Sequence, residues 1–126
     1  SARDENARWG SSELKVEVED LGARPAGHQA QTIPIVCATV AAVQSLGVEH
    51  IQYGYSSTDC NIPISLGIPA IAIPGGGASG GNHSLGEWYD PTLGYLGPQN
   101  ALLTVLLLTG LAGVTAPQLV QMAKPN

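Results

Sequence analysis

The sequence predicts an α/β fold with a parallel or mixed sheet. The first reason is that segments of strand character alternate along the chain with segments of helical periodicity. The second is the continuous apolar run Ile68–Ile73, which is typical of a strand buried on both faces of a sheet. Apolar residues make up 44% of the 126 residues, which is enough for a packed core in one domain or in a piece of a larger one.

The first predicted element is a strand over Glu13–Glu19. Charged and apolar residues alternate there with a period of two, as in a strand with one face buried and the other in water. A strand needs neighbours, and no other segment near the start of the chain has strand character. We therefore expect its partner strands to lie in another domain.

A helix is predicted next, over 33–46. Its apolar residues fall at helical spacing, and Pro34 suits a first turn because that position needs no N–H. Thr32 can cap the helix, and Gly47 follows as its stop.

Two more strands and a final helix complete the pattern. His50–Tyr55 and Ile68–Ile73 read as strands, with one helical turn over Ile62–Leu66 between them. A helix from Gly97 to about Leu111 is apolar on nearly every face, so we expect it to be buried. It is shorter than the roughly 20 residues that a membrane-spanning helix needs. From Thr115 onward we expect a short helix or disorder.

Composition and charge exclude several classes of function. Only 12% of the residues are charged, about half the usual share, so we expect some of the surface to be covered by protein that this chain lacks. A formal net charge of −5 argues against binding to a nucleic-acid backbone, which needs clustered Lys and Arg, and there is no basic patch for an anionic membrane.

Cys37 and Cys60 lack the CxxC spacing of zinc sites and are expected to be small buried hydrophobic residues. Ser1–Arg8 lacks the apolar core of a secretory signal, so we expect a cytoplasmic protein. The sequence also lacks an initiator Met, so we expect its gene to begin upstream of Ser1.

Polar loops follow both of the later strands. In α/β sheets, ligands gather at the carboxyl ends of the strands. Here these ends carry Ser56–Asn61 and the glycine-rich stretch Gly75–His83. If the two strands are neighbours, the loops lie side by side, so the sequence predicts one binding site built from both.

His83 is the candidate metal ligand of this site. Glycines before it let the backbone approach a ligand closely, an imidazole can bind zinc, and Glu87 four residues on can orient the ring. The spacing alone leaves an ordinary surface histidine just as open, because a zinc site needs three or four ligands.

Three other interpretations use the same region. Gly77–Gly81 matches G-x-S-x-G with Ser79 as nucleophile, but a nucleophile elbow needs a helix directly after the serine and a histidine further along. A phosphate cradle would need the Lys-Ser/Thr ending of a P-loop, which is missing. Asp59 can be a helix cap or a ligand-facing residue, and these two roles are compatible.

Two longer motifs resemble the M20 family of zinc metallopeptidases and amidohydrolases. The stretch from Ser57 to Gly77 (STDCNIPISLGIPAIAIPGGG) is similar to a late segment of that family's catalytic domain. The stretch from Gly80 to Pro91 (GGNHSLGEWYDP) is similar to its last metal-ligand motif. Glu5–Gly10 and Gly22–Gly27 resemble the end of the family's inserted lid domain, so the resemblance covers nearly the whole chain. Cys60 departs from the Ala or Gly that is common at its position.

The resemblance implies that 25–126 is the C-terminal part of a three-layer αβα catalytic domain. It implies that 1–24 ends a lid domain through which such enzymes usually form homodimers. It also implies a hydrolase in which two zinc ions activate a water that attacks a peptide or N-acyl amide bond. Carried over residue by residue, His83 is a zinc ligand with Glu87 as its orienting neighbour. The residues that would line the substrate are Ser57, Thr58, Asp59, Asn61, Gly80 and Gly81.

The other ligands that the family uses have no counterpart in this sequence. Its early H-x-D motif and paired Glu-Glu lie upstream in the family, and neither pattern occurs here. We therefore expect the chain alone to bind zinc weakly and to hydrolyse nothing. Its expected partner is the N-terminal part of the catalytic domain, and without that part it should expose a large apolar patch. The alternative is a non-catalytic α/β interaction domain.

Overall fold

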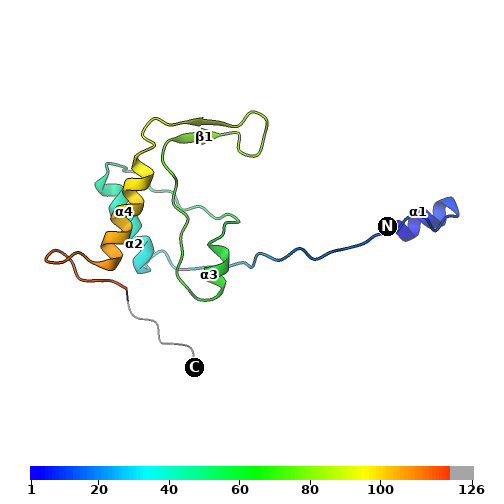
Figure 1. Cartoon of the computed structure of the whole chain (residues 1–126), viewed down its shortest axis with the longest axis horizontal. Helices are drawn as coiled ribbons and strands as arrows, with labels where there is room; N and C mark the ends of the chain where they lie inside the picture. Colours follow the sequence, from blue (N-terminus) through cyan, green and yellow to red (C-terminus); the bar gives the residue numbers. More distant parts are fainter. Residues whose placement is uncertain (120–126) are drawn as a thin grey trace, which may run out of the picture.

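The computed structural model describes residues 1–119 and shows helices joined by long irregular segments, with one small hairpin. Helices α2 and α4 lie side by side, the hairpin lies beyond one end of this pair, and α1 lies at the far end of an extended segment (Figure 1). The elements are α1 (Ala2–Trp9), α2 (Pro34–Ser45), α3 (Asn61–Ser65), β1 (Ala78–Gly80), β2 (Trp88–Asp90) and α4 (Leu96–Thr109).

The contact between α2 and α4 is the core of the described residues. Ala42 of α2 is 2% exposed and Leu108 of α4 is 8% exposed, and no other apolar side chain among residues 1–119 is as deeply buried. Polar groups share this interface. The buried hydroxyl of Thr104 lies 3.3 Å from the hydroxyl of Thr39 and 3.4 Å from the side-chain oxygen of Asn100, so each has a partner.

Both long helices were predicted, with differences at their ends. The N-cap of α2 is Ile33 and not Thr32, because Pro34, which lacks an N–H, takes the first helical position. Helix α4 ends at Thr109, before the expected Leu111, because Gly110 leaves the helical region with a φ of 81°. The expected burial of α4 on every face is wrong, because α2 is the one helix that packs against it in the described part of the chain.

None of the three predicted strands forms in the described residues. Segments 13–19, 50–55 and 68–73 pair with no strand, so the expected parallel or mixed sheet is not formed there. Such segments need a neighbour to complete their backbone hydrogen bonds. The three-layer arrangement and the domain boundary at residue 24 remain predictions.

A short antiparallel hairpin occurs instead, where a glycine-rich loop was expected. Strand β1 pairs with β2 in the register Ala78 to Asp90, Ser79 to Tyr89 and Gly80 to Trp88. After α4 the chain turns back in a single bridge between Leu111 and Thr115, and no helix follows as far as residue 119. Residues 120–126 of the predicted tail lie outside the described part.

Two side-chain carboxamides take the place of strand partners. The Asn6 side chain accepts from the N–H of Leu14 at 3.1 Å and donates to its carbonyl at 2.8 Å. The Gln29 side chain accepts from the N–H of Ala70 at 3.2 Å and donates to the carbonyl of the same residue. Each carboxamide therefore satisfies both backbone groups of one residue in a segment that was predicted to be a strand.

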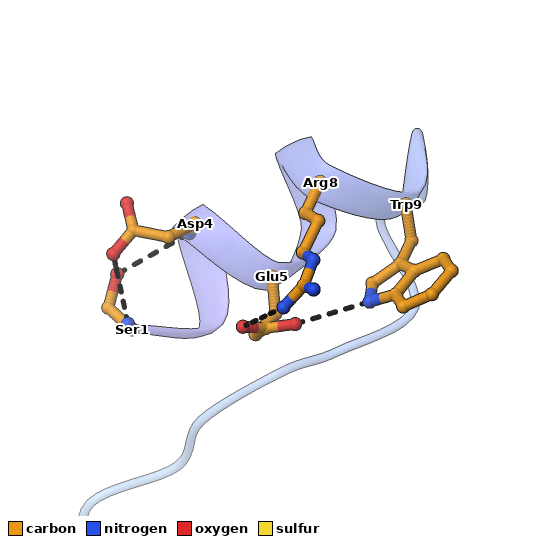
Figure 2. A network of polar contacts seen from close by, with 5 residues as sticks. All are labelled: Ser1, Asp4, Glu5, Arg8 and Trp9. Carbon is orange, nitrogen blue, oxygen red and sulfur yellow. Dashed lines mark hydrogen bonds and ion pairs between the residues drawn. The ribbon is translucent and has the colours of Figure 1, made fainter.

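Helix α1 is held by contacts within its own length (Figure 2). Ser1 caps it by accepting from the N–H of Asp4, and hydrogen bonds from the N-terminal ammonium and the Ser1 hydroxyl lower the pKa of Asp4. The indole of Trp9 donates to Glu5 at 3.2 Å, and the guanidinium of Arg8 lies 5.5 Å from the Trp9 ring centre.

The chain exposes much more surface than a compact protein of its mass. Its accessible area is 10301 Å², whereas a compact monomer of 12.9 kDa would expose about 6,300 Å².

Cys37 is exposed and Cys60 is half-buried, so the prediction that both are buried is wrong. Within residues 1–119, no helix combines the length and the apolar character that crossing a membrane requires.

Candidate functional site

The loop between β1 and β2 carries His83. This loop begins with a turn in which the N–H and the hydroxyl of Ser84 both donate to the carbonyl of Gly81, at 3.1 and 2.6 Å. The Ser84 hydroxyl then accepts from the N–H of Gly86 at 3.2 Å. These bonds tie the ends of the turn together, and His83 lies at its third position.

His83 adopts a backbone conformation that is uncommon for a residue with a side chain. Its φ is 65°, in the left-handed region that glycine normally occupies at the third position of such turns. The residue is exposed. Glycine occurs at positions 80, 81 and 86 of the same short segment, yet a histidine holds this position. Unfavourable backbone conformations of this kind gather at ligand-binding and catalytic sites.

The described residues do not surround His83 with a group of three metal ligands. Glu87 is exposed, and the structure forms no hydrogen bond between it and His83, so its orienting role remains a prediction. Within residues 1–119, no three His, Cys, Asp or Glu side chains come together in a group that could hold a metal ion. The donor set on this part of the chain therefore does not by itself fit zinc, which takes three or four protein ligands.

The two glycines predicted to lie near a substrate have local structural roles. A Cβ at Gly80 would come within 2.7 Å of the Trp88 indole nitrogen, so the missing side chain lets this ring pack on β1. Gly81 has a φ of 64°, and a Cβ there would meet the carbonyl oxygen of Gly86 at 2.7 Å. Both glycines are required by the hairpin, and their role toward a substrate remains a prediction.

Ser79 does not have the geometry of a nucleophile elbow. It lies in the middle of β1, opposite Tyr89, and β1 leads into a turn and not into a helix. An elbow places its serine between a strand and a helix that follows directly. No helix follows the glycine-rich loop directly as in a P-loop, although Gly75 and Gly76 pack against the first turn of α4. On the return strand, the carboxylate of Asp90 accepts from the N–H of Thr92 at 2.9 Å, and this bond lowers the pKa of Asp90.

The polar cluster before α3 is bound to a segment that precedes α2. The guanidinium of Arg24 donates to the Ser57 hydroxyl at 3.2 Å and to the Asp59 carboxylate at 3.0 Å. Asn61 donates to the carbonyl of Pro25 at 3.1 Å and accepts from the N–H of Thr58 at 3.1 Å. Four of the six predicted substrate residues thus form one small polar network.

The predicted cap role of Asp59 is not observed. The N-cap of α3 is Cys60, which makes no side-chain hydrogen bond, and Asp59 pairs with Arg24 instead. Arg24 was not among the predicted site residues. The signal that could have found it is the scarcity of cations, since a chain with five Lys and Arg residues has few partners for an acidic cluster.

The structure does not bring the two predicted loops together. Helix α3 and the hairpin lie at opposite ends of the long connection between them (Figure 1). The contacts between elements in the described residues are those of α2 with α4 and of β1 with β2. The Ser57–Asn61 network and His83 are therefore two separate regions.

We expect the ion pair of Arg24 with Asp59 to add little to stability. The Asp59 side chain is 95% exposed, and exposed pairs contribute about 0–1 kcal/mol. Replacing Arg24 with glutamine should lower the free energy of unfolding by no more than about 1 kcal/mol, and by less in high salt. Urea denaturation at low and high salt measures this, with Arg3→Gln in exposed α1 as control. A larger loss that salt does not reduce would contradict it.

Comparisons with protein-family models, with curated proteins and with solved structures found no match for this chain.

Proposed function

We propose that this chain is the C-terminal part of an M20-type zinc metallopeptidase or amidohydrolase, to which it contributes His83 as one metal ligand. The observation that carries the proposal is the conformation of His83. An exposed imidazole occupies a left-handed turn position at the tip of a hairpin, in a segment rich in glycines that would fit this position without strain. The sequence around it (GGNHSLGEW) has the pattern of a family metal-ligand motif.

The remaining ligands must come from another part of the protein. One histidine does not make a zinc site, and the described residues offer no group of three ligands. The large exposed area supports a missing partner, because surface of this extent is normally covered in a folded protein. We propose that this partner is the N-terminal part of the catalytic domain, and that the parent protein forms homodimers through its lid domain.

The substrate that we propose is a peptide or an N-acyl amino acid, with the Ser57–Asn61 network and Gly80 and Gly81 on its side of the site. Hydroxyl, carboxylate and amide groups in this network suit the polar backbone of such a compound. The compartment that we propose is the cytoplasm, since both cysteines are free thiols and disulfides are rare there.

A zinc titration of the whole chain, followed by the NMR signals of its histidines, tests the ligand role. We expect weak binding in which the imidazole signals of His83 shift at lower zinc concentrations than those of the exposed His28 and His50. Replacing His83 with asparagine, which also tolerates the left-handed conformation, should weaken this binding about tenfold or more and leave the hairpin intact.

The two other histidines are internal controls for this titration. Equal shifts at His28, His50 and His83 would contradict a special role for His83. Tight, stoichiometric binding by the chain alone would contradict the proposal that the ligands are shared. The coding sequence upstream of Ser1 gives an independent check, because the enzyme proposal fails if it contains neither an H-x-D nor an E-E pattern.

A further inference from the structure

The segment between α1 and the body of the molecule, residues 12–23, forms an extended arm (Figure 1). Every residue of the arm is exposed, and none makes a backbone–backbone hydrogen bond. The burial and hydrogen bonding of the backbone around a bond decide how readily proteases cut it. An endopeptidase takes up its substrate as an extended strand and binds the free backbone groups of that strand. The arm therefore has the conformation of a protease substrate in the folded chain.

Lys15 is the basic residue within this arm. It is exposed, and its ammonium group forms no ion pair within residues 1–119. Serine endopeptidases of the trypsin class bind a Lys or Arg side chain in a pocket that contains a carboxylate. The free ammonium group of Lys15 suits this pocket, and the bond that such an enzyme then cuts is the one to Val16.

Two of the four other basic residues precede a proline. These are Arg24 and Lys124, which are followed by Pro25 and Pro125. Proline has a tertiary nitrogen, and its ring obstructs the leaving-group side of a trypsin-class active site. Neither bond is a good substrate, so the sequence from Val16 onward contains no other bond that suits such an enzyme.

The remaining two basic residues, Arg3 and Arg8, lie in α1. Their backbone belongs to the helix, so α1 must open locally before either bond fits an extended cleft. The guanidinium of Arg8 also lies 3.9 Å from the Glu5 carboxylate and 5.5 Å from the Trp9 ring centre. The bond after Lys15 needs no such opening, so we expect it to be cut first.

A cut after Lys15 separates α1 from the body of the molecule. The hydrogen bonds of the Asn6 side chain to Leu14 lie on the N-terminal side of the cut, together with α1. On the other side, Arg24 keeps its ion pair with Asp59. Within residues 1–119, α1 has no contact with another helix or strand. The cut therefore leaves the contact between α2 and α4 as it is in the intact chain.

We propose that the bond between Lys15 and Val16 is the first cleavage site of this chain for serine endopeptidases that cut after Lys and Arg, and that the cut releases α1 from a body that stays folded. The serine oxygen of the enzyme bonds to the carbonyl carbon of Lys15, and the bond to the Val16 nitrogen breaks. This nitrogen leaves as an amine with a proton from the histidine of the enzyme. Water then hydrolyses the acyl-enzyme and frees the Lys15 carboxylate.

Pairing of the arm with another strand would protect this bond, because the partner would occupy the backbone groups that the protease needs. The bond is therefore open to proteases only while the arm has no partner strand. This inference does not depend on the proposed zinc site, since it uses no residue of the His83 loop.

Brief digestion of the 126-residue chain with trypsin, followed by mass spectrometry, tests the site. We expect 1–15 and 16–126 as the first products. Val16→Pro keeps the charge of Lys15 and suits an extended arm. It should slow the loss of the intact chain about threefold or more, because the bonds that remain require α1 to open. The control is Arg3→Gln, which removes a basic residue of α1 and should leave this rate unchanged. A first cut after Arg8, or a Val16→Pro chain that is lost as fast as the parent, would overturn the proposal.

Two further measurements distinguish cleavage of the folded chain from cleavage through unfolding. The rate of the cut after Lys15 should be the same in Ala42→Asp, which weakens the contact between α2 and α4, because the bond is open without unfolding. The purified fragment 16–126 should keep the helical circular dichroism of α2 and α4 and their thermal midpoint. A rate that rises with Ala42→Asp would refute the proposal, and so would a fragment that has lost this helical signal.

Discussion

Replacing Gly97 with alanine is expected to destabilise the docking of the glycine-rich loop on α4 by about 1–3 kcal/mol. A Cβ at Gly97 would lie 2.1 Å from the carbonyl carbon and oxygen of Gly75, and 2.5 Å from the backbone nitrogen of Gly76. These are backbone atoms, so no side-chain rotation relieves the clash. The loop or the start of the helix must move.

The sign of this effect distinguishes packing from helix propensity. Gly97 lies inside α4, and glycine to alanine within a helix normally stabilises by about 1 kcal/mol. Urea denaturation followed by circular dichroism measures the change. The control is Gly54→Ala, since a Cβ at Gly54 meets no atom within 4 Å. A Gly97→Ala chain as stable as the parent would show that the loop does not pack on α4 as described.

Replacing Ala42 with aspartate is expected to separate α2 from α4, at a cost of about 3–5 kcal/mol. Ala42 is 2% exposed, and neither α2 nor α4 contains a Lys or Arg that could pair with a carboxylate there. Burial would raise the pKa of the new carboxyl. The penalty is therefore present at neutral pH and is relieved as the pH falls through that raised pKa.

The neighbouring residue provides a matched control for this prediction. Ala41 lies in the same helix and is exposed, so Ala41→Asp changes the charge and the helix propensity by the same amounts without burial. The thermal midpoint of the helical signal, measured at neutral and acidic pH, compares the two variants. Equal midpoints at neutral pH would contradict the described contact between the helices.

The helices were predictable because their determinants are local. Pro34 at the first position of α2 and Gly110 after α4 set the ends of these elements within the sequence itself. Strands depend on partners that are distant in the chain. Segments 13–19, 50–55 and 68–73 have strand patterns, but the described residues supply them with no neighbour, and the pattern alone does not reveal this.

The candidate site was predictable in its members and not in its arrangement. Polar residues at Ser57–Asn61 do form one network. Its other half is Arg24, which lies 35 residues before Asp59 in the sequence. The expectation that this network meets the His83 loop depended on a sheet. Without paired strands, nothing sets the distance between the two loops.

Helix α1 has a consequence for how this molecule unfolds. Its cap, ion pair and Trp9 contacts all lie within residues 1–9. Among residues 1–119, the two hydrogen bonds of the Asn6 side chain to Leu14 are its one side-chain link to the chain beyond Ser11. Isolated helices of this length are marginal in water, so we expect α1 to melt and reform quickly while α2 and α4 stay packed. We therefore expect thermal unfolding to show no single all-or-none transition, and the helical signal to contain a gradual component that mutations in α2 and α4 leave unchanged.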